Sequence, residues 1–219
     1  MADSTQTLRL KHLLAIRWFH WINFPLLGMM IWSGILIYWA YSPYHIGGFH
    51  IFPEWFVDAL NINFRLAEGM ALHFLFMWLF VTNGILYVGY TILSGEWKML
   101  VPRRFSAFRD AWHVFLHDLH LRKEVPAQDK YNAAQQIAYT AIIVMGVGSL
   151  LSGLAIYKPV QLAWLVALQG GYRSARLIHF LLAAGYVGFF AIHIMQVVLA
   201  GWNNFRSMVM GYELVNDHE

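Results

Sequence analysis

Four of the eleven histidines lie inside or at the ends of long apolar segments, where an ionisable side chain is costly. They are His20, His73, His179 and His193. Neutral imidazoles in such places serve as metal ligands, as proton relays or as partners in hydrogen bonds between helices. Because the chain has no cysteine, any metal must be held by nitrogen, oxygen or thioether ligands.

The composition indicates that these histidines lie in a membrane. Of the 219 residues, 59% are hydrophobic and 12% are charged, and the mean hydropathy is +0.49. Soluble domains carry about 25% charged residues. A hydrocarbon core of roughly 30 Å needs about 20 apolar residues in a helix, and four segments qualify: about 21–39, 72–93, 137–157 and 177–202. We therefore predict an all-α integral membrane four-helix bundle, with residues 1–219 forming a single domain.

The positions of Lys and Arg predict the orientation of the spans. Eleven of the 15 lie on one side, seven of them in the loop 94–136, and four lie on the other side. Positive residues favour the cytoplasmic side, so we expect both termini and this loop in the cytoplasm. Within the loop, the stretch "FRDAWHVFLHDLHLRKE" predicts an additional amphipathic cytoplasmic helix at the interface. Its His113, His117 and His120 favour a polar helix face over a metal site.

Depth along the helices sorts the four histidines into two pairs. His20 begins the first span at its cytoplasmic end, whereas His73 and His179 begin the second and fourth spans near the outer face. His193 follows His179 by fourteen residues, which is about 21 Å and nearly four full turns. The two imidazoles of the fourth span therefore face similar directions. One pair, His73 and His179, lies near the outer face, and the other, His20 and His193, lies near the inner face.

Two pairs of neutral imidazoles at two depths suit two b-type haems. Each iron needs two axial nitrogens on opposite faces of the macrocycle, which different helices of a bundle can supply. Gly34, fourteen residues after His20, can face the outer ring. The small residues of "GVGSLLSGL", residues 146–154, favour close helix packing instead. Arg17 and Arg176 each precede a histidine by three residues, which suits haem propionates or, equally, anchoring at the interface.

The residues also leave other functions open. Four intramembrane histidines without haem could form a transporter of protons or metal ions, which predicts no visible absorption. The chain could also be a purely structural anchor for an extracytoplasmic oxidoreductase. Four histidines at two matched levels, without intramembrane carboxylates to relay protons, favour haem over a proton relay.

Several motifs resemble the bacterial di-haem cytochrome b membrane subunits. The stretch "RWFHWINF" with the later Ser33-Gly34 is similar to their first helix, "KYNAAQQIAY" to the start of their third, and "RLIHF" with "IHIM" to their fourth. The second helix is matched mainly by the histidine after "FRLAEGMALH". These relatives are the gamma subunit of formate dehydrogenase and the b-type cytochromes of nickel–iron hydrogenase and thiosulfate reductase. The resemblance covers nearly all of residues 12–205.

The resemblance implies the same histidine pairing and adds a quinone site. In the formate dehydrogenase relative, menaquinone binds near the inner haem, beside the helix 4 ligand and an asparagine that begins helix 3. The matching positions here are His193 and Asn132, with Gln135 keeping the polar character. A glycine of the relative is Ala134 here, which narrows the expected pocket. Asn132 can also serve simply as the N-cap of its helix.

The function that this resemblance implies is electron transfer in a respiratory chain. Electrons would pass between an extracytoplasmic redox subunit (an iron–sulfur, molybdenum or nickel–iron enzyme), two haem b groups and a membrane quinone, either menaquinone or ubiquinone. The expected location is the bacterial cytoplasmic membrane. In a variant of this function, quinol feeds an outer reductase. We expect no catalytic residue in this chain, because the cofactors supply the chemistry.

Overall fold

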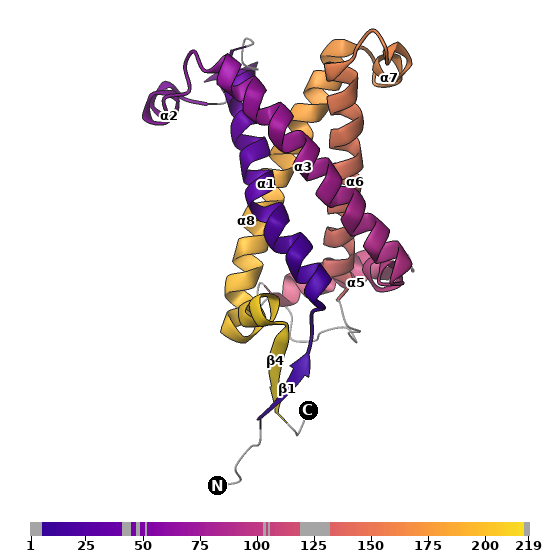
Figure 1. Ribbon diagram of the computed structural model, residues 1–219. Coiled ribbons are helices and arrows are strands. Elements are labelled where there is room, and N and C mark those ends of the chain that lie inside the picture. Colours follow the sequence, from indigo (N-terminus) through magenta and orange to yellow (C-terminus); the bar gives the residue numbers. More distant parts are fainter. Residues whose placement is uncertain are drawn as a thin grey trace. The chain divides into compact units, whose positions relative to one another are not determined.

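The computed structural model describes residues 6–40, 45–46, 49–50, 52–102, 104, 106–118 and 132–216. The chain divides into two compact units, which are described separately. Figure 1 shows the helices and strands, coloured along the sequence. The first comprises Met1–Tyr87 and Val197–Glu219, and the second comprises Val88–Gln196. His120 and the lysine and tyrosine that precede Asn132 lie outside the described residues.

Four long helices have the length and hydropathy to cross a membrane, as predicted. They are α1 (Leu14–Trp39), α3 (Leu66–Leu93), α6 (Ala133–Tyr157) and α8 (Tyr172–Met210). Each begins four to seven residues before the predicted span, because a helix continues into the interface where polar residues are tolerated. Inside α8, Gly201 adopts φ 79° and ψ 177°, which interrupts the helix next to the predicted end of the span. The protein is an all-α multi-pass membrane protein.

In the first unit, α1 and α3 run antiparallel and approach closely at Gly69. A Cβ atom on Gly69 would lie 2.8 Å from the Cβ of Leu36 and 3.2 Å from the carbonyl oxygen of Ser33. Only glycine allows this separation between the two backbones. Beyond the end of α1, the short helix α2 (Glu54–Ala59) buries Val57 together with Leu36 and Ile62. The contact at Gly69 sets the distance between α1 and the following turn of α3.

A two-stranded ribbon joins the two ends of the first unit, which the sequence analysis did not predict. Strand β1 (Gln6–Leu10) pairs antiparallel with β4 (Tyr212–Asn216). A second short ribbon pairs β2 (His45–Ile46) with β3 (Phe49–His50). Each strand has only two to five residues, so its alternating pattern is too short to identify from hydropathy.

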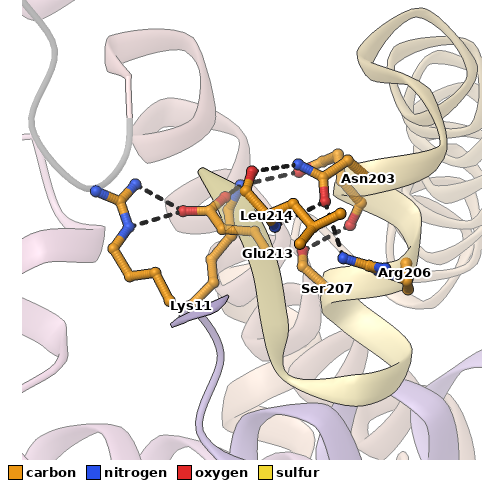
Figure 2. Close-up of polar contacts among 8 residues, drawn as sticks. Lys11, Asn203, Arg206, Ser207, Glu213 and Leu214 are labelled. Atoms are coloured by element: carbon orange, nitrogen blue, oxygen red, sulfur yellow. Dashed lines mark hydrogen bonds and ion pairs between the residues drawn. The ribbon is translucent and has the colours of Figure 1, made fainter. Parts of the chain in front are cut away.

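Polar contacts hold the two strands of the terminal ribbon together and attach the ribbon to the last turns of α8 (Figure 2). Glu213 accepts from Arg9 and pairs with Lys11, each at 2.7 Å. Asn203 exchanges two hydrogen bonds of 2.9 Å with the backbone of Leu214. Partial burial by itself would raise the pKa of Glu213, but the hydrogen bonds and charges of Lys11 and Arg9 outweigh it and hold the pKa below its usual value.

In the second unit, α4 (Trp97–Leu100) and α5 (Ser106–Asp118) pack against α6. Helix α5 confirms the predicted amphipathic helix over the part of that stretch that the structure describes. Thr140 of α6 donates to the carbonyl of Leu100 at 3.3 Å, which ties α4 to α6. The short α7 (Ala163–Leu168) connects α6 to α8 and buries Leu165 against Ala155 and Ala175.

Candidate functional site

His73 of α3 lies against a Ser-Gly pair of α1. The Nδ1 atom of His73 is 2.9 Å from the Oγ atom of Ser33, whose side chain is completely buried. Ser33 Oγ also lies 2.7 Å from the carbonyl oxygen of Met29, four residues earlier in its own helix. A Cβ on Gly34 would be 3.8 Å from His73 Cε1. The close approach at Gly69, one turn before His73, brings these groups within reach of each other.

His179 of α8 lies against a second Ser-Gly pair, which belongs to α6. The Nδ1 atom of His179 is 2.9 Å from Oγ of Ser152, a residue that is 1% exposed. Ser152 Oγ lies 2.7 Å from the carbonyl oxygen of Gly148, again four residues earlier. A Cβ on Gly153 would be 3.3 Å from His179 Cε1. Gly148 packs against Leu182 of α8, so the predicted role of the small residues of α6 in close packing holds.

These two arrangements match in detail. Helix α3 begins at Leu66 and α8 at Tyr172, so each histidine lies seven residues after the start of its helix. In each ring, Nδ1 lies next to a buried serine, and the ring edge is adjacent to a glycine. His179 differs in that it also hydrogen-bonds with the backbone of Ser149. The chemistry of this donor set fits a haem ligand, because a neutral imidazole fixed through Nδ1 offers Nε2 to a metal. The pairing of His73 with His179 around one iron remains a prediction.

His20 of α1 has polar and aromatic neighbours within the first unit. Its ring meets that of Trp21 edge-on, with centroids 5.2 Å apart. On either side of it, Phe19 meets Tyr87 of α3 at 5.8 Å, and Asn23 accepts from the Nδ2 atom of Asn83 at 3.5 Å. Asn83 is only 8% exposed. A buried amide within an apolar helix pair indicates a polar patch one turn from His20.

His193 of α8 is half-buried and stacks on an aromatic ring. The rings of His193 and Phe189 are nearly parallel, at an interplanar angle of 6°, with centroids 5.8 Å apart. Phe189 lies one turn earlier in the same helix, so it restricts the orientation of the imidazole. His20 and His193 belong to different units, and their pairing also remains a prediction.

The arginines beside the histidines have different surroundings. Arg17 donates through Nη2 to the carbonyl of Val209, and Trp21 Nε1 donates to the carbonyl of Met208 at 3.1 Å. These contacts tie the start of α1 to the end of α8. Anchoring at the membrane interface and pairing with a haem propionate both stay predictions for Arg17. In the described ranges, nothing accepts from the buried Nε of Arg17, so an acidic group could still bind there. Arg176 is half-buried, one turn before His179.

Asn132 caps helix α6, as the alternative interpretation predicted. Its side chain accepts from the backbone N–H of Gln135 at 2.8 Å, and the Gln135 side chain accepts from the Asn132 backbone N–H at 3.0 Å. This reciprocal pair is a capping box. Each amide group still has its NH₂ donors, so a second role toward a quinone carbonyl is compatible with the capping role.

The histidines of α5 do not form a metal cluster in the part of the chain that the structure describes. No group of three His, Asp or Glu side chains there could hold an ion. His113 and His117 lie one turn apart on α5, whereas His120 lies outside the described residues. The polar-face interpretation of this segment stays a prediction.

Sequence reasoning missed the two serines that contact the ligand candidates. Ser33 entered only as part of a resemblance, and Ser152 only as one of several small packing residues. The signal that could have found them is the repeated Ser-Gly dipeptide near the ends of α1 and α6. Gly69 and Asn83 were missed as well, because their roles depend on what the partner helix places opposite them.

Four helices able to span a membrane, with buried histidine–serine contacts between them, fit the class of membrane-bound b-type cytochromes. The chain belongs to the prokaryotic cytochrome b561 family, which it matches over residues 11–211. A relative is the putative protein-methionine-sulfoxide reductase subunit YedZ1 of Azospira oryzae. It is 31% identical over 181 residues, which are 82% of this chain and 86% of that protein. The protein is therefore a membrane haem b electron-transfer subunit, which confirms the predicted family.

Proposed function

We propose that this chain passes electrons between an extracytoplasmic oxidoreductase and the membrane quinone pool through two haem b groups. The observation that carries the proposal is the duplicated Ser-Gly contact on His73 and His179. The same serine–histidine contact, at the same distance from the start of each helix, supports a common role for the two histidines near the outer face. His20 and His193 would then hold the second haem.

Different residues would bind the iron and the propionates of the two haem groups. His73 and His179 would supply nitrogen ligands near the outer face, and His20 and His193 would supply them near the cytoplasmic face. Arg17 and Arg176 would pair with propionates one turn away from their histidines. When bound, haem b supplies reversible one-electron oxidation and reduction. The helices keep these groups apart from water, and both termini and the loop 94–136 would lie in the cytoplasm.

The quinone would bind near the cytoplasmic end of the second unit. His193, Asn132 and Gln135 are the polar groups that we assign to it, and the NH₂ groups of the two amides would donate to quinone carbonyl oxygens. If quinone is reduced there, its protons come from the cytoplasm while its electrons come from the outer face. This arrangement would move charge across the membrane.

The partner would dock on the outer segments 40–66 and 158–175. Exposed aromatic residues lie in the described parts of both segments: Trp55 is 71% exposed, Phe64 is fully exposed and Trp164 is 63% exposed. Aromatic side chains that are not buried by their own chain are enriched at protein interfaces. A docking test compares partner binding by Trp55→Ala and by the control Trp112→Ala, whose tryptophan is 58% exposed but lies on α5. We expect only Trp55→Ala to weaken partner binding.

The haem assignment is tested by a pyridine haemochrome assay on the purified protein. We expect two haem b per chain, falling to one in His193→Ala, with loss of quinone reactivity and an outer haem still reducible by the partner. His113→Ala is the matched control, because it removes a histidine of α5 and should keep both haems. Two retained haems in His193→Ala would refute the ligand assignment. A colourless protein would favour the transporter, and quinone reduction that survives replacement of both His20 and His193 would favour the structural anchor.

The role of Asn132 toward quinone needs a variant that keeps the helix cap. Asn132→Leu removes both the cap and the amide donors, whereas Asn132→Ser keeps a capping oxygen and removes only the amide. We expect quinone turnover to fall in both variants at unchanged haem content. Normal turnover in Asn132→Ser would mean that Asn132 serves as a cap alone.

A second candidate reverses the direction of flow, so that quinol feeds an outer reductase. The name of the A. oryzae relative, a protein-methionine-sulfoxide reductase subunit, favours this direction. The test uses the chain co-purified with its partner and reduced by a quinol analogue. Reoxidation of the haem absorption bands by a methionine-sulfoxide protein would support outward flow. Inward flow would be supported if the reduced haem stays reduced after the methionine-sulfoxide protein is added, and if the oxidised haem is reduced by the substrate of the partner.

A further inference from the structure

We propose that Ser33 and Ser152 are positioning residues that fix the tautomer of the two outer haem ligands. Each serine oxygen would accept a hydrogen bond from Nδ1–H of its histidine and so leave Nε2 as the nitrogen that binds iron. The inference rests on the proposed function, in which His73 and His179 are these ligands. It adds two residues that act through the ligands and do not touch the iron.

The direction of each hydrogen bond follows from the other contacts of the serine. A hydroxyl group has one hydrogen to donate. Ser33 Oγ lies 2.7 Å from the carbonyl oxygen of Met29 and 3.1 Å from that of Met30. Ser152 Oγ lies 2.7 Å from the carbonyl oxygen of Gly148 and 3.3 Å from that of Ser149. Carbonyl oxygens only accept, so the hydroxyl hydrogen points to them and a lone pair of Oγ faces the imidazole.

The opposite arrangement would be costly in both units. If each serine donated to an unprotonated Nδ1, its oxygen would meet a carbonyl oxygen at 2.7 Å with no hydrogen between them. Water cannot relieve this repulsion, since Ser33 and Ser152 are 0% and 1% exposed. Nδ1 therefore carries the hydrogen, and Nε2 keeps its lone pair.

The glycine that follows each serine fixes the position of the ring. The Nδ1–Cε1 edge of His73 lies on Ser33 and Gly34, and that of His179 lies on Ser152 and Gly153. A side chain on Gly153 would approach Cε1 to 3.3 Å, which is tighter than ordinary contact. The hydrogen bond and the glycine together hold the ring in one orientation.

This arrangement has a chemical consequence for the metal. An imidazole that donates from Nδ1 is a more basic ligand through Nε2, so it favours the oxidised iron and lowers the midpoint potential. Removing the serine oxygen should raise the potential of one haem only. Both serines should affect the same haem, because their histidines are assigned to one iron.

The experiment compares Ser33→Ala and Ser152→Ala in the full chain. We expect each to raise the midpoint potential of the same haem in a spectroscopic redox titration, to change its low-spin EPR signal, and to release haem to an apoprotein acceptor about 10-fold faster. Ser207→Ala is the matched control: Ser207 is also completely buried and donates to the carbonyl of Asn204, in the last turns of α8. The control should leave both potentials unchanged.

Unchanged potentials and EPR signals in both alanine variants at full haem content would overturn the proposal. So would shifts that fall on two different haems. If an alanine variant fails to assemble, the threonine variant at that position decides, because threonine keeps the Oγ acceptor: a normal potential supports the proposal and a shifted one overturns it. If His73→Ala and His179→Ala keep both haems, the proposed function fails instead, which distinguishes the two failures.

Discussion

The helix pairs α1–α3 and α6–α8 present the same histidine site but pack in different ways. In both, a buried serine followed by a glycine contacts a histidine seven residues into the next long helix. Between α1 and α3, Gly69 faces the backbone of the other helix, whereas Gly185 of α8 faces the flexible end of the Met145 side chain. The comparison shows that the same serine–histidine contact can form across either a rigid or an adaptable helix contact.

The starts of α1 and α6 differ as well. Leu13, before α1, makes no side-chain capping hydrogen bond, and the start of this helix is held by contacts of Arg17 and Trp21 with the end of α8. The start of α6 is held by its own capping box, Asn132 with Gln135. One helix end therefore depends on distant segments, and the other depends on its own residues.

Gly69→Ala should break the rigid helix pair, and it is the largest effect that we expect. The new Cβ would lie 2.8 Å from that of Leu36, so the helices must separate, at a cost of about 1–3 kcal/mol. Gly185→Ala is the matched control in the adaptable pair, because the flexible Met145 can move away. Thermal denaturation in detergent, followed by haem absorption, should show a lower midpoint only for Gly69→Ala. Equal denaturation midpoints for Gly69→Ala and Gly185→Ala would contradict the difference between the rigid and the adaptable helix pair.

Asn132→Ala should weaken the locally held start of α6 by about 1 kcal/mol, because the capping box loses its acceptor. Asn132→Asp keeps that acceptor and should stay close to wild type. The difference can be measured as a change in the denaturation midpoint, with hydrogen exchange of the amide of Gln135 as a local probe. If exchange at Gln135 is unchanged in Asn132→Ala, the cap is not what holds this end.

Asn83→Leu should have a smaller effect on the α1–α3 pair, about 0.6 kcal/mol of destabilisation, because its hydrogen bonds to Phe19 and Asn23 are long. In the other pair, Tyr186→Phe removes a long bond of 3.5 Å to the carbonyl of Ile142 and a hydrogen bond with the Ser149 side chain, and should cost a similar amount. Unfolding of the two variants under identical detergent conditions provides the measurement. A severe loss in Asn83→Leu alone would show that this amide supports more than helix packing.

The smallest effect that we expect is a dependence of the β1–β4 ribbon, next to the start of α1, on pH. Since the folded pKa of Glu213 is lowered, its ion pairs with Arg9 and Lys11 stabilise the ribbon above its ordinary value of 4.5. This contribution is lost as the pH falls through the lower folded value. Limited proteolysis with an acid-active protease should therefore cleave near β1 faster as the pH falls below 4.5. Glu213→Gln should already show fast cleavage at pH 5 and no further increase; a wild-type pH profile in this variant would rule out Glu213 as the cause.

Hydropathy and length were sufficient to predict the four spans, because each is a local property of about 20 residues. The cap at Asn132 was also predictable, since a capping box is contained within four residues. Contacts between distant segments were not. The β1–β4 ribbon joins segments about 200 residues apart, each too short to identify alone. The Ser33–His73 contact depends on the glycine that brings two helices together, which no single-helix pattern reveals.

The terminal ribbon also has a consequence for the order of assembly. Strand β1 precedes all four membrane helices in the chain, whereas its partner β4 follows them. During synthesis β1 must therefore wait for β4 until these four helices have been made. Closure of the ribbon can thus report that biosynthesis has reached the far end of α8.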